Sequence, residues 1–183
     1  MSSPSVPTVA LLCGPKRVGK TTLCQRWVRD ARQEGWRVGG ILAPARWDDQ
    51  GNKTGIDVVD LTTDEQRLQA TIVPRGTDTT VGEYRLCPSN TQWALERMLR
   101  ALGRPLDLVV IDEMGRLELL QGGGYAPALD AIANAACQRV LIIVRDGLAD
   151  CLADRLAPLP CLRIDVSLQG RETLSGRGLA LLR

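Results

Sequence analysis

The sequence of 183 residues contains no histidine and no phenylalanine. The absence of histidine excludes any mechanism that needs a histidine base or a histidine metal ligand. Lysine is also scarce, because Lys16, Lys20 and Lys53 are the only lysines among 23 basic residues. The positive charge is therefore almost entirely arginine. This makes Lys20 notable, although a general preference for arginine would explain the scarcity equally well.

The chain also lacks paired cysteines and long apolar runs. Its six cysteines are widely separated and form no C-x2-C pair, which argues against a zinc site or a thioredoxin-like motif. Residues 1–7 have neither the charged nor the apolar region of a secretory signal, and no apolar run reaches transmembrane length. We therefore expect a reduced, cytoplasmic protein with no membrane partner.

Composition and charge are ordinary for a globular protein. The hydrophobic fraction is 44%, the charged fraction is 24%, and the formal net charge is only +2. Acidic and basic residues are interleaved, so no electrostatic footprint for nucleic acid stands out and we expect no nucleic-acid partner. The length suits one domain with one sizeable core, so we expect residues 1–183 to form a single domain. The sequence does not specify its oligomeric state.

The most informative segment is Gly14–Thr21, which fills every fixed position of the P-loop pattern G-x4-G-K-[ST]. The two glycines let the backbone bend so that successive N–H groups point at phosphate oxygens. Lys20 brings a compact positive charge to the β- and γ-phosphates, and the Thr21 hydroxyl can bind Mg²⁺. The residues expected to bind the nucleotide are Gly14, Pro15, Lys16, Arg17, Val18, Gly19, Lys20, Thr21 and Thr22.

The flanks of this loop support the match. Thr8–Cys13 is an apolar run typical of a strand, and Lys20–Glu34 has the periodicity of a helix that Gly35 ends. The apolar helix face consists of Leu23, Cys24, Trp27, Val28 and Ala31. A strand, a glycine loop and a helix start place the N–H groups of the helix N-terminus on the phosphates.

The remaining segments alternate between strand and helix patterns. Strands are expected at Arg37–Ala43, Leu106–Asp112, Val140–Val144 and Leu162–Val166, and helices after Ser89, over Pro127–Ala136 and after Asp146. Short apolar strands that alternate with helices predict an α/β fold with a mostly parallel sheet covered on both faces. Residues 44–85 differ, because turn signals separate short β-like runs at Gly55–Leu61, Ala70–Val73 and Gly82–Leu86. We interpret this segment as a β-rich excursion within the domain.

Three details of the helices can be predicted as well. Ser89 and Gln92 have the spacing of a capping box, and Asp146 could cap the helix that follows it. The expected buried helix positions are Leu95, Met98, Leu99 and Leu102 in one helix and Leu129, Ile132, Ala133 and Ala136 in the next.

A second cluster of functional residues is expected where the apolar strand Leu106–Asp112 ends in two acids. This is the Walker B arrangement, in which a buried strand delivers Asp112 to the sheet edge beside the P-loop. There Asp112 can hold Mg²⁺ through a water molecule or through Thr21. Glu113, one residue on, can orient or deprotonate the water that attacks the γ-phosphate.

Asp112–Gly115 also satisfies the D-x-x-G pattern of switch GTPases. Those proteins normally carry an N-K-x-D guanine reader after a later strand, but here Val144 is followed by Arg145, Asp146 and Gly147. A switch GTPase is therefore disfavoured. Arg17, Arg116 and Arg145 are candidates to stabilise transition-state charge, although each could equally be a surface arginine. Arg145 joins Lys20 and Glu113 as an expected catalytic residue because it follows a central strand at the nucleotide edge of the sheet.

With these segments placed, the chain resembles the small P-loop nucleoside-triphosphatases of the thermophile-phosphatase (THEP) type. The motifs that carry the resemblance are the P-loop, Val38–Ile41 followed by Arg46, Gly55–Leu61, Val81–Tyr84 and Val110–Glu118. The last is the most specific, because that family typically has D-E-[IM]-G-x-[ML]-E there. The chain departs from the family at Ala43–Ala45, Thr54 and Ile56, positions that could line a base or substrate pocket.

The resemblance implies a P-loop NTPase fold, a three-layer α/β/α sandwich with a RecA-like sheet and a β-hairpin excursion. It also implies slow, Mg²⁺-dependent hydrolysis of nucleoside triphosphates to the diphosphate and phosphate, with broad base tolerance. Two alternatives stay open. One is a nucleotide or small-molecule kinase, although no clustered lid arginines are visible. The other is a non-catalytic nucleotide-binding adapter of the molybdenum-cofactor type, which should lack the acidic run at Asp112–Glu118.

Overall fold

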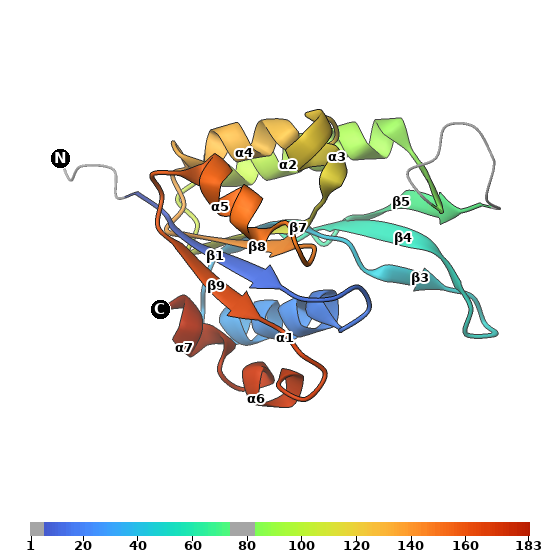
Figure 1. Cartoon of the computed structure of the whole chain (residues 1–183), viewed down its shortest axis with the longest axis horizontal. Coiled ribbons are helices and arrows are strands. Elements are labelled where there is room, and N and C mark those ends of the chain that lie inside the picture. The colour runs from blue at the N-terminus through green and yellow to red at the C-terminus, as the bar shows by residue number, and fades with distance from the viewer. Residues whose placement is uncertain (1–5, 74–82) are drawn as a thin grey trace.

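The computed structural model describes residues 6–73 and 83–183. Within them a nine-stranded sheet lies between two layers of helices (Figure 1). Helices α2, α3, α4 and α5 cover one face of the sheet, and α1, α6 and α7 cover the other. The α/β sandwich predicted from the alternating apolar segments is confirmed.

Five strands form the parallel core of the sheet, in the order β2-β7-β8-β1-β9. Their bounds are Thr8–Cys13 for β1, Val38–Leu42 for β2, Leu108–Met114 for β7, Arg139–Val144 for β8 and Cys161–Asp165 for β9. The strands β2, β7, β8 and β1 are almost fully buried, as expected for apolar strands that helices cover on both faces. Strand β8 lies between the P-loop strand β1 and the acidic strand β7 and pairs with both in parallel. The carboxyl ends of β1 and β7 therefore lie at the same edge of the sheet.

The excursion predicted for residues 44–85 continues this sheet beyond β2 as antiparallel strands (Figure 1). Its strands are β3 (Ala45–Trp47), β4 (Lys53–Asp60), β5 (Gln66–Ile72) and β6 (Tyr84–Leu86), and β3 pairs with β4 beside the main path. The strand expected over Gly82–Leu86 lies partly outside the described residues. The excursion is therefore an extension of the central sheet, and it projects past the carboxyl end of β2.

The helices are α1 (Lys20–Gln33), α2 (Pro88–Leu102), α3 (Arg116–Gln121), α4 (Ala126–Ile132), α5 (Ala149–Leu156), α6 (Arg171–Ser175) and α7 (Gly178–Leu182). The five apolar residues predicted for α1 are all buried, and they pack against one face of the sheet. Residues of α2, α4 and α5 form the core on the opposite face. None of the helices in residues 6–73 and 83–183 is long and apolar enough to cross a membrane.

Several local predictions were wrong. Ser89 does not cap α2, because Pro88 starts the helix and Cys87 is its N-cap residue without a side-chain cap hydrogen bond. Proline suits the first helical turn, where its missing N–H would have no partner anyway. Asp146 does not cap α5 either, since Leu148 is the N-cap residue and the Asp146 carboxylate accepts the backbone N–H of Gly147.

The predicted buried faces also need correction at their ends. Leu99 of α2 is 37% exposed, whereas Trp93, Ala94 and Ala101 are buried beside the expected residues. Helix α4 ends at Ile132, so Ala133 and Ala136 are exposed beyond it. The short helices α3, α6 and α7 were not predicted. A helix of five or six residues carries too few periodic positions to be recognised by its apolar pattern.

The close approach of β7 to Gly40 on β2 explains why the Val38–Ile41 motif has a glycine at this position. Gly40 has a φ of +92°, and a Cβ atom there would lie 2.0 Å from the carbonyl oxygen of Val110 on β7. We expect Gly40→Ala to lower the free energy of unfolding by about 3 kcal/mol, since clash and backbone strain add. Gly35→Ala is the control, because Gly35 has φ +81° but no atom within 4 Å of the added Cβ. Equal losses in chemical denaturation would contradict the close-approach explanation.

Candidate active site

The P-loop connects β1 to α1 and depends on two glycine conformations. Gly14 has φ +147°, and a Cβ atom there would lie 2.5 Å from the carbonyl oxygen of Val166. Gly19 has φ +95° and is the N-cap residue of α1. Both glycines have a positive φ, which agrees with the backbone bending predicted from the motif, and Arg17 between them also has a positive φ of 66°. Alternating left-handed residues of this kind turn backbone N–H groups toward one concavity, which is the geometry of an anion site.

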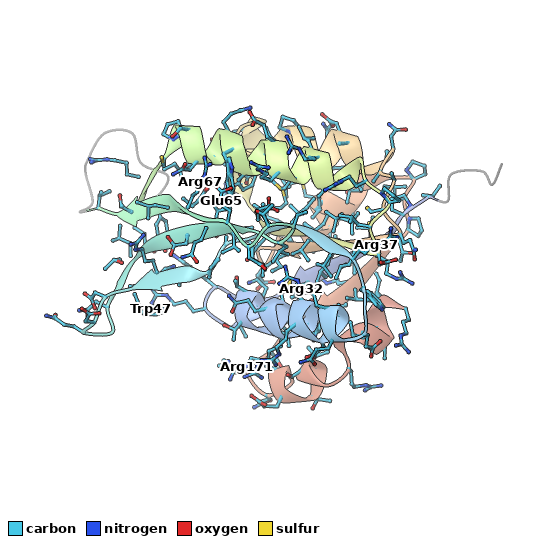
Figure 2. All side chains as sticks on the ribbon, turned by 180° about the vertical axis from the view of Figure 1, so that it is seen from behind. Arg32, Arg37, Trp47, Glu65, Arg67 and Arg171 are labelled. Carbon is cyan, nitrogen blue, oxygen red and sulfur yellow. The ribbon has the colours of Figure 1, made fainter. Side chains whose placement is uncertain are left out.

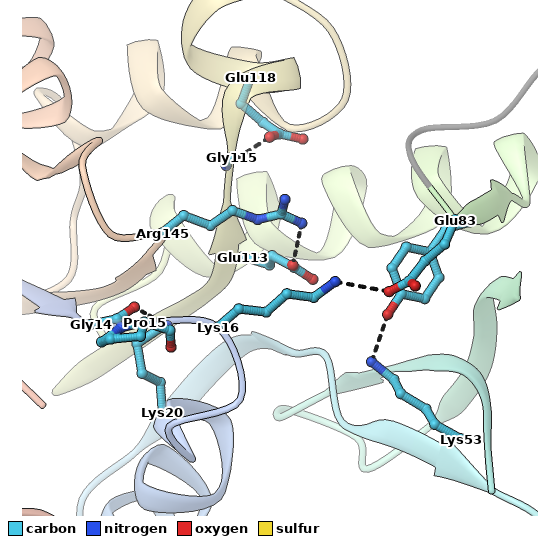
Figure 3. A network of polar contacts seen from close by, with 11 residues as sticks. Gly14, Pro15, Lys16, Lys20, Lys53, Glu83, Glu113, Gly115, Glu118 and Arg145 are labelled. Carbon is cyan, nitrogen blue, oxygen red and sulfur yellow. Dashed lines mark hydrogen bonds and ion pairs between the residues drawn. The ribbon is translucent and has the colours of Figure 1, made fainter. Parts of the chain in front are cut away.

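Lys20 lies in the first turn of α1 and reaches back over the loop. Its Nζ donates hydrogen bonds to the carbonyl oxygens of Gly14 and Pro15, the latter at 2.9 Å (Figure 3). Partial burial lowers the pKa of Lys20 from its usual value, and the carboxylates of Asp112 and Glu113 oppose that shift. The ammonium is thus held between the loop and the two acids of β7, at the place where the motif predicts phosphate contacts.

Asp112 is 1% exposed and sits near the carboxyl end of β7. One of its oxygens accepts the backbone N–H of Ala43 at 2.9 Å, and the Thr21 side chain lies close enough to lower the pKa of Asp112. Burial raises the pKa of Asp112 to about 7, while the hydrogen bond from Ala43 acts in the opposite direction. The structure therefore brings together the two residues predicted to bind Mg²⁺.

The donor set of this pair fits a magnesium ion. A hydroxyl and a carboxylate supply the hard oxygen ligands that Mg²⁺ prefers, and Mg²⁺ is usually held by one or two protein groups plus phosphates and water. A cation here would also favour the ionised form of Asp112, which burial disfavours. Among the described residues there is no cluster of three or more acidic or cysteine side chains that would form an all-protein metal cage.

Glu113 has an unusual backbone conformation. Its φ is +76°, and the register between β7 and β8 shifts between Asp112 and Met114, so Glu113 forms a bulge in the strand. A bulge redirects the side chain of the extra residue, and non-glycine residues with positive φ concentrate at functional sites. The bulge places Glu113 beside Asp112 on the wall of the same cleft. Without it, the two acids would face opposite sides of the sheet.

Arg145 follows β8 at the same sheet edge, as predicted. Its Nη2 donates a hydrogen bond to Glu113 Oε1 at 2.7 Å (Figure 3). The Arg145 and Glu113 side chains are 46% and 37% exposed, so the pair contributes little to stability. Its consequence is geometric, because it fixes the Glu113 carboxylate at the mouth of the site. The contact between these two predicted catalytic residues was not among the predictions from the sequence.

These residues surround a cleft of about 890 Å³ between the P-loop edge of the sheet and the excursion. The predicted site residues that line it are Lys16, Arg17, Gly19, Lys20, Thr21, Thr22, Asp112, Glu113 and Arg145. Gly14, Pro15 and Val18 do not line it. The Val18 side chain packs in the core below the loop. Any contact of Val18 with a nucleotide would therefore come from its backbone. The same holds for Gly14 and Pro15.

The far wall of the cleft consists of excursion residues. Pro44, Ala45 and Ile56 were predicted as possible pocket positions, whereas Trp47, Lys53 and Tyr84 were not. Trp47 lies on β3 and is 61% exposed (Figure 2), Lys53 and Ile56 lie on β4, and Tyr84 lies on β6. One signal for Lys53 was present in the sequence, since the chain has only two other lysines and both lie in the P-loop.

Glu118 stabilises the segment after Glu113. Its carboxylate accepts the backbone N–H of Gly115 at 2.9 Å in the capping box of α3 (Figure 3). Burial raises the pKa of Glu118, and backbone hydrogen bonds from Gly115 and Tyr125 oppose the shift. A Cβ atom at Gly124 would lie 2.4 Å from Glu118 Oε1, which explains a glycine there. Glu118 therefore has a structural role next to the site.

Comparison with known proteins identifies relatives over nearly the whole chain. A family model described as NTPase matches residues 9–177. A nucleoside-triphosphatase THEP1 from Methanopyrus kandleri is 30% identical over 173 residues, which cover 94% of this chain and 93% of that relative. Another nucleoside-triphosphatase THEP1, from Hyperthermus butylicus, is 34% identical over 117 residues, which cover 62% of this chain and 59% of that relative.

Two solved structures share the architecture. The solution structure of a human cancer-related nucleoside triphosphatase has a TM-score of 0.72 at 21% identity, with 94% of this chain and 96% of that chain covered. The crystal structure of THEP1 from Aquifex aeolicus has a TM-score of 0.65 at 21% identity, with 96% and 99% covered. At this identity the two structures establish the fold, an α/β domain with a mostly parallel central sheet.

Proposed function

The chain belongs to the NTPase family and is a nucleoside-triphosphatase, and from that premise we propose the details of its reaction. It hydrolyses nucleoside 5′-triphosphates to the diphosphate and phosphate in a Mg²⁺-dependent reaction. The observation that carries this proposal is the convergence of Lys20, Asp112 and Glu113 on one cleft. A phosphate-binding cation, a metal ligand and a candidate base for water are the parts that phosphoryl transfer to water requires.

The P-loop binds the triphosphate. Backbone N–H groups of Gly14–Thr22 and the Lys20 ammonium contact the β- and γ-phosphates, while Thr21 and Asp112 hold the metal. A Mg²⁺ ion held by Thr21 and Asp112 would supply positive charge against the negative charge that develops on the phosphates in the transition state. The hydrogen bond from Ala43 orients the Asp112 carboxylate for this task.

Glu113 orients the attacking water and accepts its proton, and Arg145 stabilises negative charge on the transferred phosphoryl group. The bulge at Glu113 supports this assignment because it places the carboxylate in the cleft beyond the metal ligand. Arg145 contacts Glu113 directly, so its position depends on the state of the base. Slow turnover is the expected result when no further arginine finger reaches the phosphates, because such an arginine can be worth about 10³–10⁵ in rate.

Broad base specificity follows from the same construction. Phosphate contacts come from the loop backbone and Lys20, and neither recognises a base. The chain also lacks an N-K-x-D guanine reader after β8. Of the residues that depart from the family pattern, Ala43, Pro44, Ala45 and Ile56 line the cleft and Thr54 does not, and any base preference arises at those four.

Three further expectations join the proposal. All six cysteines are within the described residues and are free, as expected for a reduced cytoplasmic protein. We propose that residues 1–183 form one domain, because the excursion strands continue the central sheet. The partners we propose are nucleoside triphosphates, with no nucleic acid and no membrane.

The test is phosphate release from ATP, GTP, CTP and UTP with Mg²⁺ and with EDTA. We expect release from all four nucleotides only with Mg²⁺, and a loss of about 10²-fold in kcat/KM for Lys20→Ala. Arg104→Ala is the control, because Arg104 is an exposed cation outside the cleft. Turnover that appears only with a phosphoryl acceptor would identify a kinase instead. Tight binding without turnover would identify a non-catalytic adapter.

A further inference from the structure

All three lysines of the chain line the same cleft. Lys16 and Lys20 belong to the P-loop, whereas Lys53 begins β4 on the opposite wall. The remaining basic residues are arginines, and most of them lie elsewhere on the molecule. A lysine ammonium is a compact point charge, suited to single phosphate oxygens, whereas arginine forms planar two-point contacts. The distribution indicates that the cleft uses lysine for a specific contact.

Tyr84 holds the Lys53 ammonium at the excursion wall of the cleft. The Lys53 Nζ contacts the Tyr84 hydroxyl at 2.8 Å and lies 5.1 Å from the centre of that ring (Figure 3). Partial burial lowers the pKa of Lys53, and the negative charges of Glu113 and Glu83 oppose this shift. Glu113 is therefore near enough to act on the Lys53 charge, although it lies on the other wall of the cleft.

Lys16 of the P-loop contacts the same part of the excursion, Glu83 and Tyr84. Its Nζ pairs with Glu83 Oε1 at 2.8 Å and lies 5.6 Å from the centre of the Tyr84 ring. Tyr84 is only 7% exposed, so it provides a fixed base under both ammonium groups. Lys53 has no carboxylate partner of its own at bonding distance among the described residues, whereas Lys16 has Glu83. Of these two lysines, Lys53 is therefore the one that is available to bind a substrate anion.

We propose that Lys53 is a catalytic residue that contacts a γ-phosphate oxygen from the wall opposite Lys20, and that Tyr84 is its positioning residue. This inference rests on the proposed function. In the reaction, the water oxygen forms a bond to the γ-phosphorus, the bond to the β–γ bridging oxygen breaks, and a water proton passes to Glu113. Lys53 keeps its proton and donates a hydrogen bond to the charge that builds up on the equatorial oxygens.

The experiment measures kcat and KM for ATP hydrolysis in Lys53→Met, Lys53→Arg and Tyr84→Phe. We expect Lys53→Met to lower kcat about 10²-fold with KM changed less than about threefold, because the contact strengthens in the transition state. Lys53→Arg keeps the charge and should recover about a tenth of the wild-type rate. The matched control is Arg85→Met, since Arg85 is an exposed cation next to Tyr84 in β6 but points to the opposite face and does not line the cleft.

Tyr84→Phe should lower kcat about fivefold in the wild-type background and have no further effect in the Lys53→Met background. A merely structural role for Tyr84 would give the same loss in both backgrounds. Binding of ADP should be equal in wild type and Lys53→Met, because ADP has no γ-phosphate. This measurement also shows that the variant is folded.

Wild-type kcat in Lys53→Met, equal weakening of ADP and ATP binding, or an equal loss in Arg85→Met would each overturn the proposal for Lys53. Those outcomes leave the proposed hydrolysis intact as long as the wild-type protein releases phosphate. If the wild-type protein released none, the proposed function would fail instead. The affinities of wild type and Lys53→Met for ADP with Mg²⁺ and fluoroaluminate, which mimics the transferring phosphoryl group, would then still decide whether Lys53 contacts that group.

Discussion

Glu113→Gln is expected to lower kcat for nucleoside-triphosphate hydrolysis by about 10³-fold while leaving nucleotide binding close to that of the wild type. The substitution keeps the size of the side chain and one oxygen that can accept the hydrogen bond from Arg145. It removes the negative charge that accepts a proton from water. Single-turnover phosphate release and nucleotide affinity, measured on the same preparation, separate the chemical step from binding.

The matched control is Glu96→Gln, because Glu96 lies on α2 outside the cleft. Within the described residues, the only hydrogen bond of its side chain is the one it accepts from the Gln92 amide. We expect this variant to retain full activity. A Glu113→Gln protein with wild-type kcat would show that water is activated by some other group. A protein that lost ATP binding in proportion to activity would show that Glu113 acts on the ground state.

Asp112→Asn is expected to have opposite effects on activity and on stability. Loss of the carboxylate removes a metal ligand, so kcat should fall by about 10³-fold. Burial raises the pKa of Asp112 from 3.8 to about 7, so the ionised form destabilises the folded state when no metal is present. In EDTA at pH 8 we therefore expect Asp112→Asn to be more stable than the wild type by about 3 kcal/mol.

The pH dependence follows from the direction of this shift. A group whose folded pKa is raised destabilises the folded state least below its unfolded pKa, and the penalty is complete above its folded pKa. The stability advantage of Asp112→Asn should therefore be largest at pH 8 and shrink as the pH falls from about 7 toward 4. Denaturation curves at pH 8, 6 and 5 test this, with the partly exposed Glu113→Gln as control. An advantage that stayed constant with pH would mean that the Asp112 charge carries no desolvation penalty.

The parts of the site that could be predicted from sequence are those governed by local rules. The P-loop pattern specifies glycine conformations at Gly14 and Gly19, and both are observed. Parallel strands end at a common sheet edge, which brought Asp112 to Lys20 and Thr21 although about ninety residues separate them in the chain. The helix face of α1 was predicted completely, because a helix of this length repeats its apolar pattern several times.

The parts that could not be predicted depend on contacts between distant segments. Lys53 and Tyr84 meet through pairing of β4, β5 and β6, and no local pattern specifies that register. The bulge at Glu113 arises where β7 pairs with β8, so the sequence of β7 alone predicted a regular strand that ends at Asp112. At Ser89 a capping signal competed with the preference of Pro88 for the first turn, and the proline position determined where the helix begins.

Hydrolysis in water enriched in ¹⁸O tests the central claim most directly, which is that Glu113 directs water at the γ-phosphorus. Mass spectrometry of the products reports which phosphorus received the water oxygen. We predict one ¹⁸O atom in each released phosphate, none in the diphosphate, and the same labelling at a rate about 10³-fold lower in Glu113→Gln. Label in the diphosphate, or phosphate released without label, would contradict this account.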